Sequence, residues 1–290
     1  MLVEGGQSIT KRRSFIINKQ LTTLLLTIAG WAVIPAAHAE SASINTRSGN
    51  EFGLSISSYS YEEPSVNVSL TGDKFGMSYT GTAVLKNDWF VREELRFAYG
   101  KVDYSGSGVQ LGVPDWYYEV RGLLGKDLQV RNVAYSPYIG FGYRYLFNDV
   151  RGYSNAGSAG YRRESSYFYL PLGVTHHLEM RDQAVLSTTL EFDYFLRGKQ
   201  VTRLSDLIGR NGFTSAFDTT NRQNSGSGYR LNVMYEMSDW AFGPFLNVWK
   251  IDTSEVTTQV MTDGSGPRLV KLYEPQNQTS EYGFRVNHRF

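Results

Sequence analysis

The chain contains 290 residues, with 29 lysines and arginines against 28 aspartates and glutamates, so its formal net charge at pH 7 is +1. This balance gives no reason to expect a nucleic-acid partner. Cysteine is absent, which excludes a disulfide framework, a thiolate zinc site and a lipidated N-terminal cysteine.

Residues 1–39 have the organisation of an export signal. The basic run KRR at 11–13 precedes the apolar stretch LTTLLLTIAGWAVIPAAHA, which ends in the small residues Ala-His-Ala at 37–39. This order is typical of a cleaved signal peptide. An uncleaved helical anchor is the alternative, but Pro35 and the A-x-A end favour cleavage. We therefore predict that the mature chain starts with a short periplasmic leader at 40–51.

The rest of the chain reads as strands. Once the signal is removed, no long apolar run remains, so any membrane crossing must use strands. From residue 52 onward, apolar and polar residues alternate in ten segments, and the longest alternation runs from Tyr135 to Phe147. A period of two predicts strands, and each segment is close to the ~9–11 residues of a tilted transmembrane strand. We predict a ten-stranded antiparallel up-and-down transmembrane β-barrel over 52–290.

The connections between these segments alternate in length. The short ones are residues 86–88, 179–183 and 238–239, with a somewhat longer one at 125–132. The long ones are residues 62–74, 101–115, 148–164, 198–228 and 252–280. Outer-membrane barrels have short periplasmic turns and long extracellular loops. We therefore expect both ends of the mature chain on the periplasmic side.

A soluble β-sandwich or lipocalin would also show alternation, with its apolar face packed inward. In this chain the opposite face carries charge and glycine, as a narrow lumen would. Trp89 and Trp240 lie where strands meet short turns, and Trp116 lies where a strand meets a long loop. Tryptophans at such positions are typical of membrane interfaces. The pattern favours the membrane barrel.

The closing segment, EYGFRVNHRF, alternates up to its last residue. Tyr282, Phe284, Val286 and Phe290 resemble the C-terminal β-signal that the outer-membrane assembly machinery reads. The stretches PDWYYEVRGLLGKDL, SPYIGFGYRYLFND and GYRRES are similar to Gram-negative, proteobacterial outer-membrane β-barrel proteins of poorly defined function. The resemblance implies an outer-membrane location, contact with outer-membrane lipid and lipopolysaccharide, and insertion by the barrel assembly machinery. It implies little about activity.

The histidines argue against a barrel enzyme. Omptin proteases are the natural comparison, being ten-stranded barrels with acidic pairs and a histidine at the outer rim, and barrel lipases pair a serine with a histidine in the outer half. Here His38 lies in the signal, whereas His176, His177 and His288 lie at predicted periplasmic strand ends. His176 and His177 should point to opposite faces of a strand, which disfavours a metal site. We expect no catalytic site, metal or cofactor.

With the apolar phase outward, the inner face receives a set of charges. The predicted lumen charges are Arg92, Glu94, Arg96, Glu119, Arg121, Arg144, Glu191, Asp193, Arg197, Arg230, Glu236, Glu281, Arg285 and Arg289. Buried charges require partners, and an arginine can bridge two carboxylates. Arg144 is therefore expected to pair with Glu119 or Glu191. A plug of paired charges is the first interpretation, and a narrow pore is the alternative.

Two segments leave the register open. Glu93 falls on the lipid face between Val91 and Leu95, so either a β-bulge moves it inside or the assumed register is wrong. Residues 240–251 carry apolar side chains in both phases.

Recognition is expected in the long loops. Arg162, Arg163, Arg203 and Arg210 are candidate contacts for lipopolysaccharide phosphates, and a solvated loop is the alternative. Leu204, Leu207 and Ile208 in TRLSDLIGR are expected to form an amphipathic turn. The sequence thus predicts a monomeric outer-membrane barrel with a structural or surface-interaction role. A narrow porin-like channel is the alternative, and a barrel enzyme is a third reading.

Overall fold

The computed structural model describes residues 44–130, 133–180 and 184–290. The predicted signal peptide and the first residues of the predicted leader lie outside the described residues. Within the described ranges, no helix is both long and apolar enough to cross a membrane. The strands are β1 (Gly49–Glu63), β2 (Val68–Val84), β3 (Trp89–Gly106), β4 (Gly108–Lys126), β5 (Leu128–Val130), β6 (Val133–Tyr153), β7 (Ala159–Glu179), β8 (Val185–Thr202), β9 (Thr219–Gln223), β10 (Gly226–Met237), β11 (Trp240–Ile251), β12 (Thr257–Asp263), β13 (Gly266–Leu272) and β14 (Asn277–Arg289).

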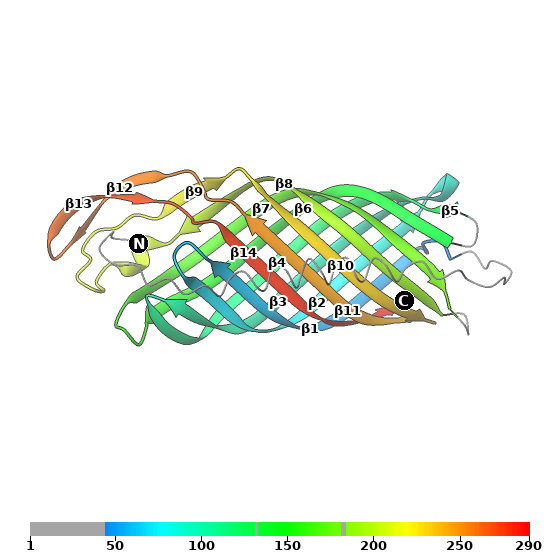
Figure 1. Ribbon diagram of the computed structural model, residues 1–290, viewed down its shortest axis with the longest axis horizontal. Coiled ribbons are helices and arrows are strands. Elements are labelled where there is room, and N and C mark those ends of the chain that lie inside the picture. Colours follow the sequence, from blue (N-terminus) through cyan, green and yellow to red (C-terminus); the bar gives the residue numbers. More distant parts are fainter. Residues whose placement is uncertain (1–43, 131–132, 181–183) are drawn as a thin grey trace. The chain divides into compact units, whose positions relative to one another are not determined.

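Ten of these strands close into an antiparallel barrel (Figure 1). Their order is β1, β2, β3, β4, β6, β7, β8, β10, β11 and β14, and β14 pairs with β1. This seam runs from Glu51 opposite Arg289 to Glu62 opposite Gln278 in one continuous register. β5 and β9 attach to β6 and β8, whereas β12 and β13 form a separate hairpin. The predicted fold class is confirmed.

The alternation places apolar side chains on the outer wall. On β6, Ile139 and Phe141 are each 50% exposed, whereas Arg144, in the other phase, is 1% exposed. β11, which the sequence left open, directs Trp240 outward and buries Phe245 and Trp249 inside. Its inner apolar residues are needed there because a barrel of this size is filled largely by its own side chains.

The strands are longer than the membrane requires. β6 and β7 have 21 residues each, about twice the ~9–11 residues of a transmembrane strand. Residues 62–74 and 101–115, expected to be loops, are mostly strand, because β1 and β2 continue to a turn at 64–67 and β3 and β4 to a turn at Ser107. Residues 252–280 contain the β12–β13 hairpin (Figure 1). We call this end of the barrel the loop end.

The opposite end, which we call the turn end, has short connections. The β2–β3 turn is the 3-10 element η1 (Lys86–Asp88), in which Asn87 and Asp88 have φ of 59° and 64°. The β10–β11 turn uses Ser238 at φ 54°. Asparagine and aspartate tolerate this left-handed conformation better than most residues. β5 folds back on β6 inside the expected 125–132 connection.

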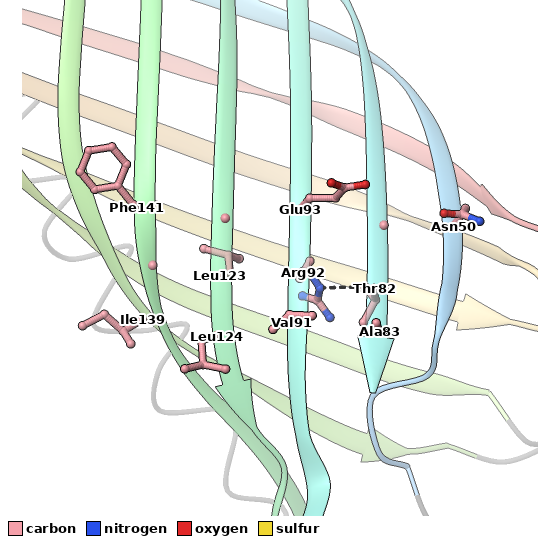
Figure 2. Close-up of a pocket in the computed structure, with 13 residues that line it drawn as sticks. Asn50, Thr82, Ala83, Val91, Arg92, Glu93, Leu123, Leu124, Ile139 and Phe141 are labelled. Carbon is pink, nitrogen blue, oxygen red and sulfur yellow. Dashed lines mark hydrogen bonds between the residues drawn. The ribbon is translucent and has the colours of Figure 1, made fainter. Parts of the chain in front are cut away.

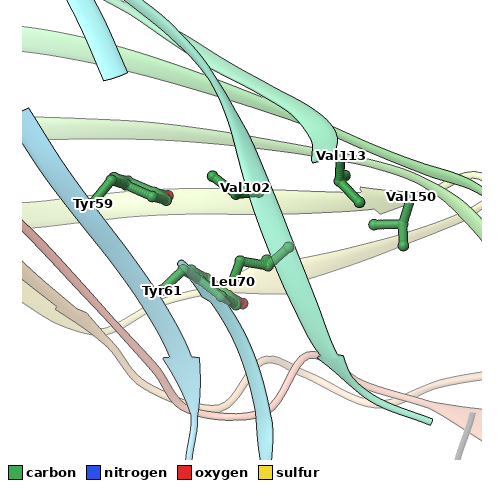
Figure 3. Packing of buried hydrophobic residues seen from close by; sticks show 6 residues of the cluster. All are labelled: Tyr59, Tyr61, Leu70, Val102, Val113 and Val150. Atoms are coloured by element: carbon green, nitrogen blue, oxygen red, sulfur yellow. The ribbon is translucent and has the colours of Figure 1, made fainter. Parts of the chain in front are cut away.

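The loop half of the lumen has an apolar core. Figure 3 shows one cluster, made of Tyr59, Tyr61, Leu70, Val102, Val113 and Val150. A second cluster contains Tyr167, Tyr169, Phe195, Trp249 and Ile251. Because these side chains come from strands on several sides of the barrel, they fill the space between its walls.

A small cap packs beside this core. The 3-10 element η3 (Leu204–Leu207) buries Leu204 and Leu207 against Ala216 and Met261. The expected amphipathic turn is therefore present, but Ile208 is 49% exposed. Met261 belongs to β12, so the cap joins η3 to the β12–β13 hairpin.

Candidate functional site

The middle of the lumen is crossed by a bidentate ion pair. Arg230 on β10 donates from Nη1 and Nη2 to the two carboxylate oxygens of Glu119 on β4, at 2.8 and 2.6 Å. Its Nε donates to Asp193 Oδ2 on β8 at 2.7 Å. The Tyr169 hydroxyl donates to Glu119 Oε1 at 2.7 Å. All four side chains are buried, and the planar arginine fork allows the two carboxylates to be held at once.

A second arginine continues the network. Arg121 donates from Nε and Nη2 to Glu94 Oε2 on β3 at 3.0 and 2.6 Å. Its Nη1 also contacts Glu191 on β8, which accepts a hydrogen bond from the Tyr138 hydroxyl at 2.6 Å. Arg230 Nε lies 2.9 Å from Glu191 as well. The charges therefore form one connected layer, as buried charges require.

Two further groups extend this layer toward β1 and β2. Glu281 on β14 accepts hydrogen bonds from Tyr117 Oη at 2.7 Å and Ser57 Oγ at 2.9 Å. Lys74 forms a buried ion pair with Asp115, and its Nζ lies 3.6 Å from the centre of the Tyr59 ring. Sequence reasoning missed Lys74 and Asp115, because both lie in segments that it assigned to loops.

Arg144 does not make the expected ion pair. Its guanidinium lies 4.2 Å from the centre of the Tyr117 ring and 5.8 Å from that of Trp249. Nε and Nη1 have no hydrogen-bond partner among the described residues. Glu119 stands opposite Arg144 in the β4–β6 register, but its oxygens are already bound by Arg230.

Arg197 is not in the lumen. The β7–β8 register shifts between Phe168 and Tyr169, where Leu196 is the extra residue on β8. This bulge reverses the phase of the strand after Phe195, so Arg197 is exposed and lies 5.0 Å from the centre of the Phe168 ring. Bulges of this kind change which face a side chain occupies, and alternation alone does not locate them.

Glu93 lies on the outer wall, and the expected bulge is absent. β3 pairs without a shift here, with Glu93 opposite Gly81 on β2 and Gly122 on β4. These residues lie in an outer depression of about 840 Å³, whose lining includes Val91 and Phe141 (Figure 2). The carboxylate has no hydrogen-bond or ion-pair partner among the described residues. The strand register was therefore right, and the bulge hypothesis was wrong.

A polar cavity opens below the network, toward the turn end. Its volume is about 180 Å³. Its lining residues include Arg92, Arg96, Arg121, Arg230, Arg285, Arg289, Glu51, Glu94, Glu236, Ser136, His177, Ser187 and the leader residues Ile44, Asn45, Thr46 and Arg47. Arg289 pairs with Glu51, and its Nη2 lies 3.8 Å from Glu236.

A hydrogen-bonded chain on one wall of this cavity contains a serine–histidine contact. His177 Nε2 lies 3.1 Å from Ser136 Oγ, and His177 Nδ1 lies 2.9 Å from Ser187 Oγ. Ser187 contacts Glu236 in turn, and Ser136 donates to Asp127 Oδ1 at 2.6 Å. Sequence reasoning missed Ser136 and Ser187, because a single serine in the inner phase of a strand carries no signal of its own.

The other histidines lie elsewhere. His176 pairs with the Tyr135 ring at 5.2 Å between centroids, and His288 with Trp240 at 4.6 Å. His176 and His177 have different neighbours, as the alternation predicted. The described ranges contain no cluster of three or more histidine, aspartate or glutamate side chains that would hold a metal ion.

The loop-end arginines have partners within the chain. Arg162 pairs with Asp206 at 2.8 Å, and Arg203 with Glu164 and Asp218 at 2.7 and 2.9 Å. These ion pairs neutralise Arg162 and Arg203, two of the arginines predicted to contact lipopolysaccharide phosphates. Arg210 lies 6.0 Å from the centre of the Tyr153 ring.

Arg163 faces inward and contacts two carboxylates. It pairs with Glu63 at 2.6 Å and also contacts Glu274. The Tyr61 hydroxyl oxygen lies 2.7 Å from Glu63 Oε1 and 2.9 Å from Glu274 Oε1, and its one proton can be donated to either carboxylate. Burial, opposed by Arg163 and reinforced by the charge of Glu63, raises the pKa of Glu274 to about 7.

Comparisons with known proteins identify the fold. No family model and no curated protein matches the sequence. The outer membrane protease OmpT from Escherichia coli has a similar structure, with a TM-score of 0.57 and 11% identity over 87% of this chain and 99% of OmpT. This is the fold of an outer-membrane β-barrel. An outer-membrane channel from Pseudomonas putida F1 aligns over 88% of this chain and all of that chain, at a TM-score of 0.37 and 12% identity.

This comparison corrects the expectation that the chain is not an enzyme. A barrel that shares its fold is a protease, so the exclusion of catalysis from the sequence does not stand. The prediction of no catalysis concerned the outer half of the barrel, whereas the serine–histidine contact lies near the turn end. At 11% identity the likeness carries the fold and no site residues.

Proposed function

We propose that the protein is an integral outer-membrane barrel whose lumen is closed by its own side chains and which acts through its loop-end surface. The observation that carries this proposal is the buried charge layer around Arg230 and Glu119. The apolar clusters of the loop half lie in the same lumen. An ion crossing the barrel would have to displace both.

The outer wall supports the membrane placement. On β1 the outward residues are Phe52, Leu54 and Ile56, followed by Ser58 and Ser60 toward the loop end. An apolar band followed by polar residues is expected where a barrel leaves the bilayer. Together with the predicted export signal, this supports assigning the turn end to the periplasm and the loop end to the cell exterior.

The β12–β13 hairpin supplies the proposed contact surface. Val260 and Leu269 are cross-strand partners and are 49% and 71% exposed. Met261, in the opposite phase, is buried in the cap. We take this exposed apolar pair, on a hairpin held by packing, as the centre of the proposed contact surface. Lipopolysaccharide remains a proposed partner, through Arg210 and the exposed part of Arg162.

Planar-bilayer recording tests the closed lumen. The refolded wild-type barrel should show no steady conductance, because the charge layer and the apolar clusters obstruct the path. Arg230→Ala, which leaves Glu119 and Asp193 without their shared cation, should produce at most erratic openings. A reproducible wild-type conductance whose ion selectivity changes in Arg230→Ala would replace this proposal with the narrow channel.

A second candidate function is hydrolysis at the turn-end cavity, favoured by the contact between Ser136 and His177. The Nδ1–H of His177 can donate to Ser187, which leaves Nε2 without a proton. The single hydroxyl proton of Ser136 has two acceptors in reach, Asp127 Oδ1 at 2.6 Å and His177 Nε2 at 3.1 Å. When the hydroxyl turns from Asp127 to Nε2, the pair has the arrangement of a serine nucleophile and its base. A fluorophosphonate probe should then label the wild type and not Ser136→Ala. Equal labelling of the two, or no labelling of a folded wild type, would exclude this candidate.

A further inference from the structure

Three arginines at the turn-end cavity lack a carboxylate of their own. Arg92 donates to the Thr82 hydroxyl at 3.2 Å. Arg96 reaches Glu119 at 3.5 Å, and the Tyr117 hydroxyl at 3.3 Å. The side chain of Arg285 has no hydrogen bond or ion pair to any described residue, and its Nε is buried. All three side chains line the same cavity.

Arg96 and Arg285 also share a neighbour. The guanidinium carbons of Arg96 and Arg285 lie 5.8 and 4.9 Å from the centre of the Phe245 ring. Two like charges are thus held against one aromatic ring inside the barrel. Like charges in a poorly solvated site repel each other, unless an anion lies between or beside them.

Most of the nearby carboxylates are held by other arginines, and Glu281 accepts its hydrogen bonds from Tyr117 and Ser57 and not from Arg96 or Arg285. Glu119 is held by both terminal nitrogens of Arg230, and Glu94 and Glu191 are held by Arg121. Glu51 is paired with Arg289. Arg92 and Arg285 are therefore left without a carboxylate partner, and Arg96 has only its 3.5 Å contact with Glu119, which it shares with Arg230. By contrast, Arg121 and Arg230 have buried contacts of 2.6 to 2.7 Å with their carboxylates.

The strands between Arg96 and Arg285 leave room beside them. Arg96 is on β3 and Arg285 on β14, separated by β2 and β1. The inner residues of these two strands include Gly53, Ser55 and Ser78, paired as Ser55 with Arg285 and Ser78 with Arg96. The cavity of about 180 Å³ has room for about six waters at ~30 Å³ each. A small oxyanion with a few waters would also fit.

We propose that this cavity binds a small oxyanion, of the phosphate, sulfate or carboxylate class, through Arg96 and Arg285 with Arg92 at its edge. Guanidinium groups match such anions because their N–H donors form paired hydrogen bonds with two oxygens. The leader residues Asn45 and Thr46 line the cavity, and Asp127 holds Thr46 by two hydrogen bonds of 2.6 and 2.8 Å. The anion enters from the turn end, because the side chains that close the lumen block the path from the loop end.

Calorimetric titration of the refolded, lipid-free protein in micelles with inorganic phosphate tests the site. The wild type should bind phosphate, and chloride at the same ionic strength should not reproduce the heat. Arg285→Gln should weaken binding at least tenfold. Arg222→Gln, which removes an exposed loop-end arginine, is the matched control and should bind like the wild type. Absence of phosphate binding by the folded wild type overturns the proposal, whatever the variants do.

Unfolding in urea gives a second readout with an opposite sign for two arginines. In phosphate-free buffer, Arg285→Gln should unfold at the same or a higher urea concentration than the wild type, because it removes an unpaired, half-buried charge. Arg230→Gln should unfold at a lower one. Phosphate should raise the wild-type midpoint and leave that of Arg285→Gln almost unchanged. An equal rise in both proteins would show that phosphate acts elsewhere, and would overturn the assignment. Neither result depends on whether the barrel conducts.

Discussion

Arg230 and Glu119 face each other across the lumen with two hydrogen bonds of 2.8 and 2.6 Å, although 111 residues separate them in the chain. The pair links β10 to β4, strands that are not neighbours in the barrel wall. It therefore acts as a strut through the interior and adds to the hydrogen bonds of the wall.

Removing one partner of this strut should be costly. Arg230→Gln leaves Glu119 and Asp193 as buried carboxylates without their cation, a change that typically destabilises by ~3–5 kcal/mol. We expect a clearly lower urea midpoint in micelles, followed by heat-modifiable gel migration. Arg222→Gln should unfold like the wild type, and an equal loss in both variants would assign the effect to arginine content.

Glu93 should be a weak point of the outer wall. It faces the bilayer from a depression beside Gly81 and Gly122 and has no described partner. Its position near the turn end limits the cost of the charge to about 1 kcal/mol or less, since such costs decline toward the interface. Glu93→Leu should stabilise the barrel in lipid vesicles. Glu62→Leu, at an exposed loop-end position, should not, and a destabilised Glu93→Leu would indicate an unrecognised partner.

The loop end should lose stability as the pH rises. The pKa of Glu274 is raised from 4.5 to about 7 in the folded protein, so the folded state binds its proton more tightly than the unfolded state does. This contribution is complete below about pH 4.5 and is lost as the pH rises through about 7. Proteolysis of the β12–β13 hairpin should therefore be faster at pH 8 than at pH 5.

Glu274→Gln provides the control for this pH dependence. Glutamine keeps the shape of the side chain and cannot ionise, so the rates at pH 5 and pH 8 should become similar once the protease's own pH dependence is subtracted. If the proteolysis rates of the wild type and of Glu274→Gln depended on pH in the same way, Glu274 would not be the cause.

The assignment of the two barrel ends can be tested with introduced cysteines, because the natural chain has none. Ser265 lies in the exposed β12–β13 turn, and Ser238 in the exposed β10–β11 turn. On intact cells, an impermeant maleimide should label Ser265→Cys and leave Ser238→Cys unlabelled. The reverse pattern would invert the barrel.

Alternation predicted the strands and most of their faces because, across the bilayer, outward residues are apolar and inward residues are polar. Ile139 and Arg144 lie on the sides that their positions indicated. The rule ends where the bilayer ends: β1 to β4 continue as strand through residues 62–74 and 101–115, where polar composition is compatible with either strand or loop. Lys74 and Asp115 were missed for that reason.

The site was harder to predict than the wall. Arg197 left the lumen because of a one-residue bulge. Arg144 does not pair with Glu119 because both oxygens of that carboxylate are bound by Arg230, which comes from a distant strand. Such competition depends on distances across the barrel, which no local pattern contains. The contact between Ser136 and His177 arises in the same way, from two strands whose pairing brings isolated residues together.

The seam between β1 and β14 also sets the order in which the barrel is completed. Ser57 on β1 donates to Glu281 on β14, 224 residues further along the chain. The edge of β1 that faces away from β2 is therefore paired only after the last strand has been added. Contacts of such long separation make folding slow, and an unpaired strand edge is a template for aggregation. Until β14 pairs with it, that edge of β1 is open to pairing with other chains, and a chain truncated before residue 277 would keep it open.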